Sequence, residues 1–361
     1  MKIKYIGNFN DGTGWAKAST YNALALSHAG YDIYCQEFKY NDMNNILEPE
    51  IQDLMDKKSD SFDVVIQHIL PKDYRYFGGI KNIGFTVLET NTLSNLPWIK
   101  NMRMMDEMLV PNKASQKALE LLGIKSKILP HTFNFDAVSG TTTAASVEQL
   151  KNSFNFVFVG EFVKRKNLEA LLRAFHNEFN INEPVNLYIK TWGTTLQAVT
   201  NLCHEVKNKL KKSAKYKTEI IICDYLPENV VLSTMKQCHF FVMPSYGEAW
   251  CYPAIEAMAL GLPVVHTRGI GIDDYTEDTI TGISVESRVE PCYGALDTIA
   301  DLYTSRDTWN EISVADLQTK MRMAYNTYYH TKDQYDAISK NAIEAASKYN
   351  YKNCEFVKGI L

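Results

Sequence analysis

Two glutamates eight positions apart, Glu248 and Glu256, are the residues of this chain best suited to carry chemistry. They lie in the stretch 240–265, which reads FFVMPSYGEAWCYPAIEAMALGLPVV. We expect Glu256 in the first turn of a helix, where the helix dipole favours an acid for structural reasons alone. Glu248 lies in a loop beside Gly247 and has no such structural reason. Because a carboxylate accepts two hydrogen bonds from adjacent hydroxyls, the pair predicts a site for a ligand such as a sugar.

The elements around the two acids follow from the local pattern. The apolar run Phe240–Met243 predicts a buried strand. Pro253 stands where a helix begins, since the first N–H groups of a helix are unpaired and proline has none to lose. Gly261 would end this helix in a left-handed conformation, and Val264 opens the next strand. Such a strand–loop–helix junction offers unpaired backbone N–H groups to an anion.

A basic turn, residues 160–167 with the sequence GEFVKRKN, lies between a strand and a helix. Three consecutive cations at the positive end of a helix are unfavourable unless an anion binds. A diphosphate would supply that anion, and we expect Arg165 and Lys166 to bind it. For Lys164 a solvated position in the turn is the favoured interpretation.

The first loop, residues 10–15 with the sequence NDGTGW, joins the first strand to the first helix. Gly12 and Gly14 let the backbone approach a phosphate or a sugar closely. The spacing is not GxGxxG, and Glu37 is the one acid near the place where a dinucleotide-binding fold holds its ribose. A nicotinamide cofactor is therefore possible but has no support elsewhere in the chain.

Polar residues also follow a strand in the stretch 85–91, FTVLETN. Glu89 would stand at the carboxyl end of that strand, where ligands bind in parallel sheets, and we expect a site residue rather than a helix cap. His68 and His131 follow two other strands, and each is more simply a satisfied loop residue. No acid–histidine–nucleophile set and no metal-spaced cluster emerges from the sequence, so we expect neither a metal nor a cofactor.

Length and composition limit the alternatives. At 361 residues the chain is long enough for two domains, and a net charge of −4 gives no general attraction to nucleic acid or anionic lipid. The seven cysteines are scattered without a CxxC pair, which is typical of a reducing compartment. The first residues lack the apolar core of a signal peptide, and no stretch is long enough to span a bilayer. We therefore expect a cytoplasmic protein.

Strands alternate with helices through both halves of the chain, which predicts parallel sheets covered on both faces. The predicted strands are 3–6, 33–35, 62–66, 83–88, 108–110 and 127–129, then 154–159, 185–189, 219–223, 240–243 and 264–265. The clearest predicted helices are 15–29, 114–122, 228–237 and one capped by Asn167. Residues 137–147, AVSGTTTAASV, predict a linker, and residues 292–361 are expected to be mostly helical. The fold class is thus α/β, with two doubly wound Rossmann-like domains facing a cleft.

Six lysines precede the predicted strand 219–223. They are Lys207, Lys209, Lys211, Lys212, Lys215 and Lys217. Such a run is most often the solvated face of a helix. Contact with a polyanion stays open, although no aromatics are interleaved to stack on bases.

The stretch that carries the two acids resembles the family-4 retaining glycosyltransferases of GT-B fold. That family reads EGFGxPxxEAMAxGxPV, and here the segment 248–264 reads EAWCYPAIEAMALGLPV. The resemblance extends upstream to GEFVKRKNLEALLRAF and downstream to Gly269, Gly271, Asp274 and Gly282. It is looser in the first half, through the glycine pair of the first loop and ET…LPW…MDEMLVPN, and it covers most of the chain.

The resemblance implies specific roles. Glu256 would bind the donor ribose, Glu248 the donor sugar, and Arg165 and Lys166 the diphosphate, with help from the loop amides near Gly14. Tyr225 and Leu226 would lie by the nucleobase. The expected catalytic residues are Glu248, Lys166 and Arg165, together with Glu89 from its place at a strand end. The other expected donor-binding positions are Gly12, Trp250, Cys251, Tyr252 and Lys190.

Three features of the sequence depart from the family's pattern. Glu161 stands where an arginine is common, and Glu89 falls where many members carry a histidine. Ala249 and Cys251 replace the two glycines of the acid motif, which leaves less room for a close backbone approach.

The function that follows is a retaining transfer of a sugar from a nucleotide-sugar, with a UDP-sugar as the expected donor. It would need no metal, and the leaving phosphate would accept the proton of the acceptor. The expected divisions are 1–145 (acceptor side), 146–335 (donor side) and 336–361 (helices returning to the first domain). The acceptor stays open: a glycan, a lipid-linked or small molecule, or a DNA base.

Three alternatives remain at this point. One is a phage-type glycosyltransferase that acts on a modified DNA base. The others are a nicotinamide-dependent oxidoreductase and a non-catalytic nucleotide-sugar binder. The sequence leaves the oligomeric state open.

Overall fold

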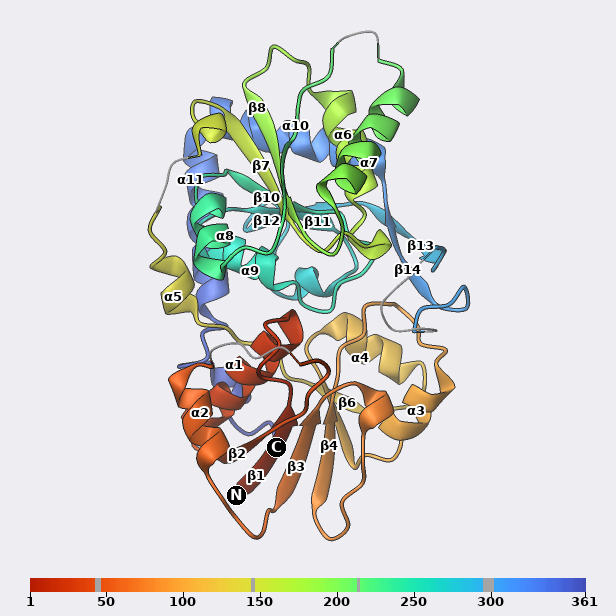
Figure 1. The fold of residues 1–361 in the computed structure, drawn as a ribbon, viewed down its shortest axis with the longest axis vertical. Coiled ribbons are helices and arrows are strands. Elements are labelled where there is room, and N and C mark those ends of the chain that lie inside the picture. Colours follow the sequence, from red (N-terminus) through yellow and green to blue (C-terminus); the bar gives the residue numbers. More distant parts are fainter. Residues whose placement is uncertain (43–46, 144–146, 213–214, 295–301) are drawn as a thin grey trace.

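The computed structural model describes residues 1–42, 47–143, 147–212, 215–294 and 302–361. Within these ranges the chain forms two lobes, each built on a parallel sheet of six strands (Figure 1). The predicted fold class, two Rossmann-like α/β domains in the GT-B arrangement, is confirmed. Both chain ends lie in the first lobe (Figure 1).

The N-terminal sheet has the strand order β2-β1-β3-β4-β5-β6. Its strands are β1 (Lys2–Gly7), β2 (Asp32–Glu37), β3 (Val64–His68), β4 (Lys81–Phe85), β5 (Glu107–Val110) and β6 (Ser126–Ile128). The helices are α1 (Gly14–His28), α2 (Pro49–Asp56), α3 (Leu96–Met102) and α4 (Lys113–Glu120). In Figure 1, α1 and α2 lie toward one side of the sheet and α3 and α4 toward the other. Every residue of the central strand β3 is buried, as expected for a parallel strand that is covered on both faces of the sheet.

The C-terminal sheet has the order β12-β11-β10-β7-β8-β9. Its strands are β7 (Phe154–Val159), β8 (Val185–Thr191), β9 (Ile220–Cys223), β10 (Phe240–Met243), β11 (Val264–Thr267) and β12 (Gly282–Val285). One helical group is α6 (Leu168–Glu178), α7 (Leu196–Leu210) and α10 (Val314–His330). A second is α8 (Glu228–Met235), α9 (Tyr252–Ala259) and α11 (Lys332–Ser347). The core of this lobe is rich in phenylalanine, from Phe154, Phe156 and Phe158 on β7 to Phe240 and Phe241 on β10.

The chain crosses between the lobes at two places that lie side by side. Phe133 leads out of the first lobe and pairs as an isolated bridge with Asn350, which follows α11 on the way back. Beyond that bridge, Tyr351, Cys354 and Val357 are buried in the same cluster as the strands of the first sheet. The last residues of the chain therefore complete the N-terminal core.

Two expectations need correction. Residues 308–312 were expected to be helical, but β14 (Thr308–Ile312) pairs with β13 (Ser287–Pro291) as an antiparallel hairpin. Its Trp309 is buried by stacking on Tyr246, a tertiary contact that no local pattern announces. The predicted linker also begins with a short helix, α5 (Phe135–Ser139), capped by Asn134. Positions 144–146 of that linker, and the domain boundary predicted there, lie outside the described residues.

In the described ranges, every helix is too short or too polar to cross a membrane.

The tail yields a first prediction. Val357 is 1% exposed, whereas the next residue, Lys358, is exposed. Val357→Asp places an unpaired carboxylate in the N-terminal core, so we expect a loss of at least about 3 kcal/mol of unfolding free energy in urea titrations. Lys358→Gln is the matched control and should stay within about 0.5 kcal/mol of the parent chain. Equal stability of the two variants would contradict the placement of the tail.

Candidate active site

Glu248 lies at the junction of the two lobes, in the loop between β10 and α9, and is 5% exposed. Its Oε1 accepts a hydrogen bond from Ser245 Oγ at 2.7 Å. The same oxygen lies 2.7 Å from Lys166 Nζ and 3.0 Å from an Arg165 terminal nitrogen. The structure thus brings together three of the four residues that the sequence marked as catalytic.

The two cations reach Glu248 because of the turn that carries them. After β7 the chain forms a short 3-10 turn, η3 (Lys164–Lys166), and then reverses at Asn167, whose φ is 54°. Asn167 precedes α6 as predicted, but its side chain makes no capping bond. Its role is to adopt the left-handed conformation, which asparagine tolerates better than most residues. We call the loop between β10 and α9, which carries Glu248, the acid loop. A 2.8 Å hydrogen bond from Tyr246 N in this loop to the Arg165 carbonyl holds the basic turn against it.

Glu89 supplies the second carboxylate of this cluster from the other lobe. It follows β4, which ends at Phe85, three residues earlier than expected. Its Oε1 lies 2.8 Å from the Arg165 guanidinium, and its Oε2 accepts a hydrogen bond from the Tyr303 hydroxyl. The sequence predicted that the cations would be unfavourable without an external anion. In the structure the chain's own carboxylates balance them.

The pKa values of Glu248 and Glu89 are shifted in opposite directions. Burial acts to raise the pKa of Glu248, but Lys166 and then Arg165 outweigh it and hold that pKa below its ordinary value. Burial raises the pKa of Glu89 above its ordinary value, and the negative charge of Glu248 adds to this, against the opposing effect of Arg165. Glu248 is therefore the carboxylate that stays ionised, and Glu89 the one that binds a proton more readily.

Glu256 is the fifth residue of α9, so the prediction that it lies in the first turn is wrong. The helix begins at Tyr252 because Cys251 before it has a left-handed φ of 66°. Glu256 forms a buried ion pair with Lys17 of α1, in the other lobe. Lys17 also lies 2.6 Å from Glu228 at the start of α8. This second cluster is again closed across the lobes by a cation and two carboxylates.

A pocket of about 330 Å³ opens beside this ion pair. It is lined from both lobes, by Lys17 and Tyr21 of α1 on one side and by Glu228, Leu232 and Glu256 on the other. The predicted cleft between the domains is therefore present next to the acid expected to hold a ribose.

The glycine loop lies across from α9. Gly12 has a φ of 69°, a conformation that favours glycine, and Gly14 is the first residue of α1. Thr13 caps α1, and Asp11 accepts hydrogen bonds from the Thr13 backbone and hydroxyl. A side chain at Gly14 would reach within 3.9 Å of the Tyr252 ring. The predicted loop and the predicted helix start thus face each other.

Trp250 and Tyr252 form a buried aromatic floor beneath the acid loop. The Tyr252 ring stacks on His131, with centroids 6.2 Å apart, and His131 lies 5.3 Å from the ring of His68. His68 in turn stacks at 4.0 Å on Phe85. Burial lowers the pKa of His131 to about 3, so this imidazole is neutral at physiological pH. Both histidines pack beneath the floor. His131 lies in a loop as expected, but His68 is the last residue of β3, and its buried Nε2 has no hydrogen-bond partner among the described residues.

Lys190, Tyr225 and Leu226 form a separate group at the ends of β8 and β9. The Lys190 ammonium lies 4.1 Å from the Trp192 ring centroid and 5.9 Å from that of Tyr225. Tyr225 is 61% exposed, and Leu226 is half-buried. Burial lowers the pKa of Lys190. The structure thus brings Lys190 to Tyr225 beside an exposed aromatic face.

Sequence reasoning missed four residues of the two clusters: Lys17, Glu228, Ser245 and Tyr303. Ser245 is three residues from Glu248, and its position in the motif's lead-in could have marked it. Lys17 and Tyr303 lie more than 200 positions from the acids they contact. No pattern in the sequence joins residues so far apart.

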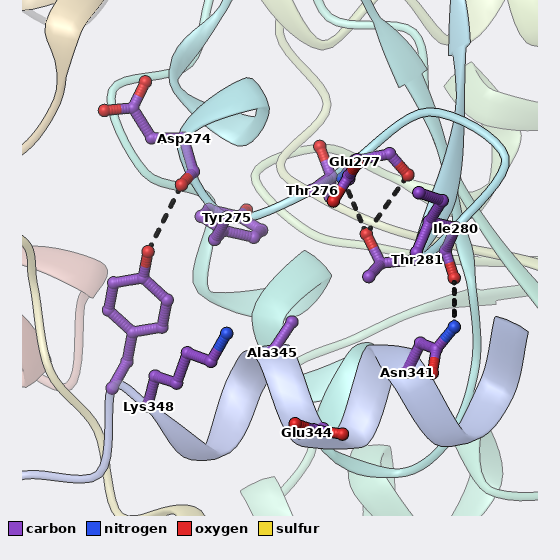
Figure 2. A pocket seen from close by; sticks show the side chains of 11 residues that line it. Asp274, Tyr275, Thr276, Glu277, Ile280, Thr281, Asn341, Glu344, Ala345 and Lys348 are labelled. Atoms are coloured by element: carbon purple, nitrogen blue, oxygen red, sulfur yellow. Dashed lines mark hydrogen bonds between the residues drawn. The ribbon is translucent and has the colours of Figure 1, made fainter.

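Another pocket, of about 360 Å³, lies away from these residues between the 3-10 turn η4 (Gly271–Asp274), the loop after it, and α11. Figure 2 shows Thr276, Glu277 and Thr281 on one side of it, and at the other Asn341 and Glu344 on α11 and Lys348 directly after it. The Asn341 amide donates to the Ile280 carbonyl at 3.3 Å. Its lining mixes both signs of charge and includes none of the predicted site residues. Elsewhere too, within the described ranges, no three His, Cys, Asp or Glu side chains gather as a metal site would require.

The chain can now be compared with known proteins. Residues 142–312 match the family described as glycosyl transferases group 1. The matched segment contains the strands β7 to β14. It also contains Arg165, Lys166, Glu248 and Glu256. It bears out the prediction of a glycosyltransferase and the wider superfamily. The finer assignment to family 4 stays a prediction.

Two curated relatives are also named as glycosyltransferases. One is the uncharacterized glycosyltransferase 335 of Sulfolobus islandicus rod-shaped virus 1, 24% identical over 212 residues, or 56% of this chain. The other is the uncharacterized glycosyltransferase MJ1178 of Methanocaldococcus jannaschii, 28% identical over 138 residues, or 38% of this chain. The alignments span 60% and 35% of those relatives, less than two thirds of either.

Solved structures share the fold over almost the whole chain. Anabaena Alr3699/HepE in complex with UDP-glucose has a TM-score of 0.60 and 12% identity, covering 97% of this chain and 96% of that one. A glycosyltransferase from Rickettsia africae has a TM-score of 0.64 and 15% identity, covering 99% and 98%. A protein described as trehalose-6-phosphate from E. coli, bound with UDP-2-fluoro glucose, has a TM-score of 0.63 and 10% identity, covering 98% and 96%. At these identities the likeness establishes the fold.

Gly247 yields a prediction about how the lobes meet. A Cβ at this position would overlap the backbone carbonyl of Glu89. Gly247→Ala must therefore shift the acid loop and the Glu89 main chain apart, and we expect about a hundredfold loss of any sugar-transfer activity, a loss that a misplacement of about 1 Å can cause.

Gly78→Ala is the matched control for that variant. Gly78 is exposed, and a Cβ there would meet no atom within 4 Å. Steady-state rates on the parent and both variants decide the matter, and full activity in Gly247→Ala would show that the observed contact is not needed.

Proposed function

We propose that this protein is a retaining glycosyltransferase, similar to family 4, which transfers a sugar from a nucleotide-sugar to an acceptor. One observation carries the proposal: Arg165 and Lys166 converge, nearly buried, on Glu248 at the lobe junction. Their side chains are only 11% and 14% exposed. Two such cations suit a group with two negative charges, and the diphosphate of an activated sugar is that group.

In this proposal the donor binds by replacing one anion, the Glu89 carboxylate, with another, its own diphosphate, at Arg165. When a diphosphate approaches Arg165, it takes the place that the Glu89 carboxylate now occupies. Lys166 can then share its charge between the phosphate and Glu248. As the bond from sugar to phosphate breaks, negative charge builds up on the leaving diphosphate, and these fixed cations stabilise it without reorganising.

The two acids of the motif take the neutral parts of the donor. Glu248 is ionised and its oxygens can accept hydrogen bonds from sugar hydroxyls. Glu256 lines the inter-lobe pocket of about 330 Å³, where it can accept both hydroxyls of a ribose once Lys17 moves aside. The exposed Tyr225 ring, beside Leu226 and Lys190, offers a surface for the nucleobase. UDP is the proposed nucleotide, since solved structures of two similarly folded proteins are described as complexes with UDP-sugars.

The proposed chemistry keeps the anomeric configuration. The acceptor hydroxyl attacks from the face the diphosphate leaves, and the departing phosphate oxygen takes the acceptor's proton. No metal is required in this scheme, because Arg165 and Lys166 carry the charge compensation. A sugar covalently trapped on Glu89 or Glu248 would contradict it.

The lobes divide the work in this proposal. The C-terminal lobe holds the donor, and the N-terminal lobe, which contributes Glu89 and the glycine loop, faces the acceptor. A cytoplasmic location stays part of the proposal. The acceptor is a glycan, a lipid-linked or small molecule, or a DNA base.

Four of the six lysines that suggest the DNA-base alternative have partners within their own lobe. Lys207 pairs with Glu219 and Lys209 with Glu205. Lys212 and Lys217 donate to main-chain carbonyls. These four lysines form ion pairs or hydrogen bonds within their own lobe, so they do not make a free basic surface for a duplex.

A thermal-shift screen tests the donor. We expect a UDP-sugar to raise the melting temperature more than GDP-, ADP- or dTDP-sugars, and NAD to leave it unchanged. Arg165→Ala should weaken donor binding by roughly thirtyfold or more, because a charge-assisted contact to phosphate is lost. Lys164→Ala is the matched control, since its ammonium lies over the Tyr246 ring, 5.6 Å from the centroid. A shift with NAD and none with any nucleotide-sugar would overturn the proposal.

Glu248→Gln separates an enzyme from a non-catalytic binder. The amide keeps the size of the side chain but loses the charge that Arg165 and Lys166 balance. We expect the rate of donor hydrolysis or transfer to fall at least about a hundredfold. Nucleotide release from the donor, followed by chromatography, gives the rate. A parent chain that binds the donor but releases no nucleotide is a binder.

A further inference from the structure

A strap from the C-terminal lobe reaches the edge of the candidate active site. We use this name for residues 302–312, which lead into and include β14. Figure 1 places β13 and β14 at the junction of the two lobes, above α4. The strap lies outside both the acid motif and the basic turn, and it has no role in the proposed transfer.

The strap is anchored to the N-terminal lobe. Leu302 is 7% exposed and belongs to the core cluster that includes α3 and α4 side chains. Ser94 Oγ donates to Asp307 Oδ2 at 3.0 Å, and Asn91 N donates to the Thr308 carbonyl at 2.7 Å. These contacts hold the strap against the loop that carries Glu89.

The strap is also anchored to the acid loop. Trp309 stacks on Tyr246 with ring centroids 4.3 Å apart. Asn310 N donates to the Tyr246 carbonyl at 2.8 Å. Since Tyr246 is two residues before Glu248, the strap holds the loops of both cluster carboxylates at once.

Tyr303 is the strap residue that touches the cluster itself. Its hydroxyl donates to Glu89 Oε2, while Arg165 holds Oε1 at 2.8 Å. Both oxygens of Glu89 are thus occupied, one by a cation and one by a neutral donor. If a diphosphate takes over Arg165, Glu89 keeps the hydrogen bond from the Tyr303 hydroxyl.

We propose that Tyr303 is a positioning residue, which fixes the Glu89 carboxylate so that it aligns Arg165 before the diphosphate binds and stays in place afterwards. This inference rests on the proposed function. Tyr303 acts through Glu89 and does not touch the reacting atoms.

The pH dependence of catalysis reports on this role. The groups that face Glu89 are Arg165 and Lys166 from η3, Glu248 from the acid loop, and Tyr303 from the strap. Burial raises the pKa of Glu89, and the hydrogen bond from Tyr303 is one of the contacts that oppose this rise. Loss of that hydroxyl raises the pKa further, so the acidic limb of the rate profile should move to higher pH.

Tyr303→Phe tests the proposal, because it keeps the ring that packs on the N-terminal lobe and removes only the hydroxyl. We expect kcat to fall about tenfold, the usual effect of a lost hydrogen bond to a charged group. The donor KM should stay within about twofold, and the acidic limb of the kcat profile should move up. Tyr293→Phe is the matched control: this tyrosine follows β13 and lies outside the strap, is 83% exposed, and should match the parent chain.

Two further variants separate positioning from simple anchoring. Ser94→Ala loosens the strap without touching the Tyr303 hydroxyl, so it should lower the melting temperature and leave the acidic limb in place. In a Glu89→Ala background, measured with radiolabelled donor, Tyr303→Phe should cause no further loss.

Three results would overturn the inference: an unchanged profile in Tyr303→Phe, the same shift in Ser94→Ala, or a further loss in the Glu89→Ala background. A parent chain that turns over no nucleotide-sugar would instead refute the proposed function. The two failures are therefore distinguishable.

Discussion

The structure depends on the balance of charge at the lobe junction. Arg165 and Lys166 lie nearly buried between two carboxylates, Glu248 from their own lobe and Glu89 from the other. Removing one partner from such a cluster would leave a buried charge uncompensated, at a typical cost of about 3–5 kcal/mol. The same cost supports the proposed diphosphate site, since a bound diphosphate would bring the charge that Glu89 gives up. Lys17, Glu256 and Glu228 repeat the arrangement beside the inter-lobe pocket.

The rest of the fold keeps these side chains at one place. Parallel strands end at a common edge, so β7 and β10 deliver the basic turn and the acid loop side by side. Gly247 allows the acid loop to touch the main chain of Glu89, and Asn112 donates to the Ala249 carbonyl from the same side. The aromatic floor of Trp250 and Tyr252, with His131 packed beneath it, fills the space below the acid loop. The tail after α11 packs into the N-terminal core and so connects the two lobes.

Sequence reasoning found the parts that local patterns encode. Strands β7 and β10 were predicted at their observed bounds, because continuous apolar runs between turns leave few alternatives. Gly261 was also placed correctly at the end of α9, with a φ of 83°. The misses that join distant segments have one physical cause. The pairing of Lys17 with Glu256, the hydroxyl of Tyr303 on Glu89 and the hairpin β13–β14 are fixed by contacts between distant segments, which no local periodicity records.

The central claim is that the carboxylate-bound cations form the diphosphate site. A crystal structure of this protein with UDP tests it most directly. The account predicts that the two phosphates lie against Arg165 and Lys166, and that the 2.8 Å contact between Arg165 and Glu89 is broken or lengthened while Tyr303 still holds Glu89. UDP bound elsewhere, with the four side chains in their present pairs, would contradict it.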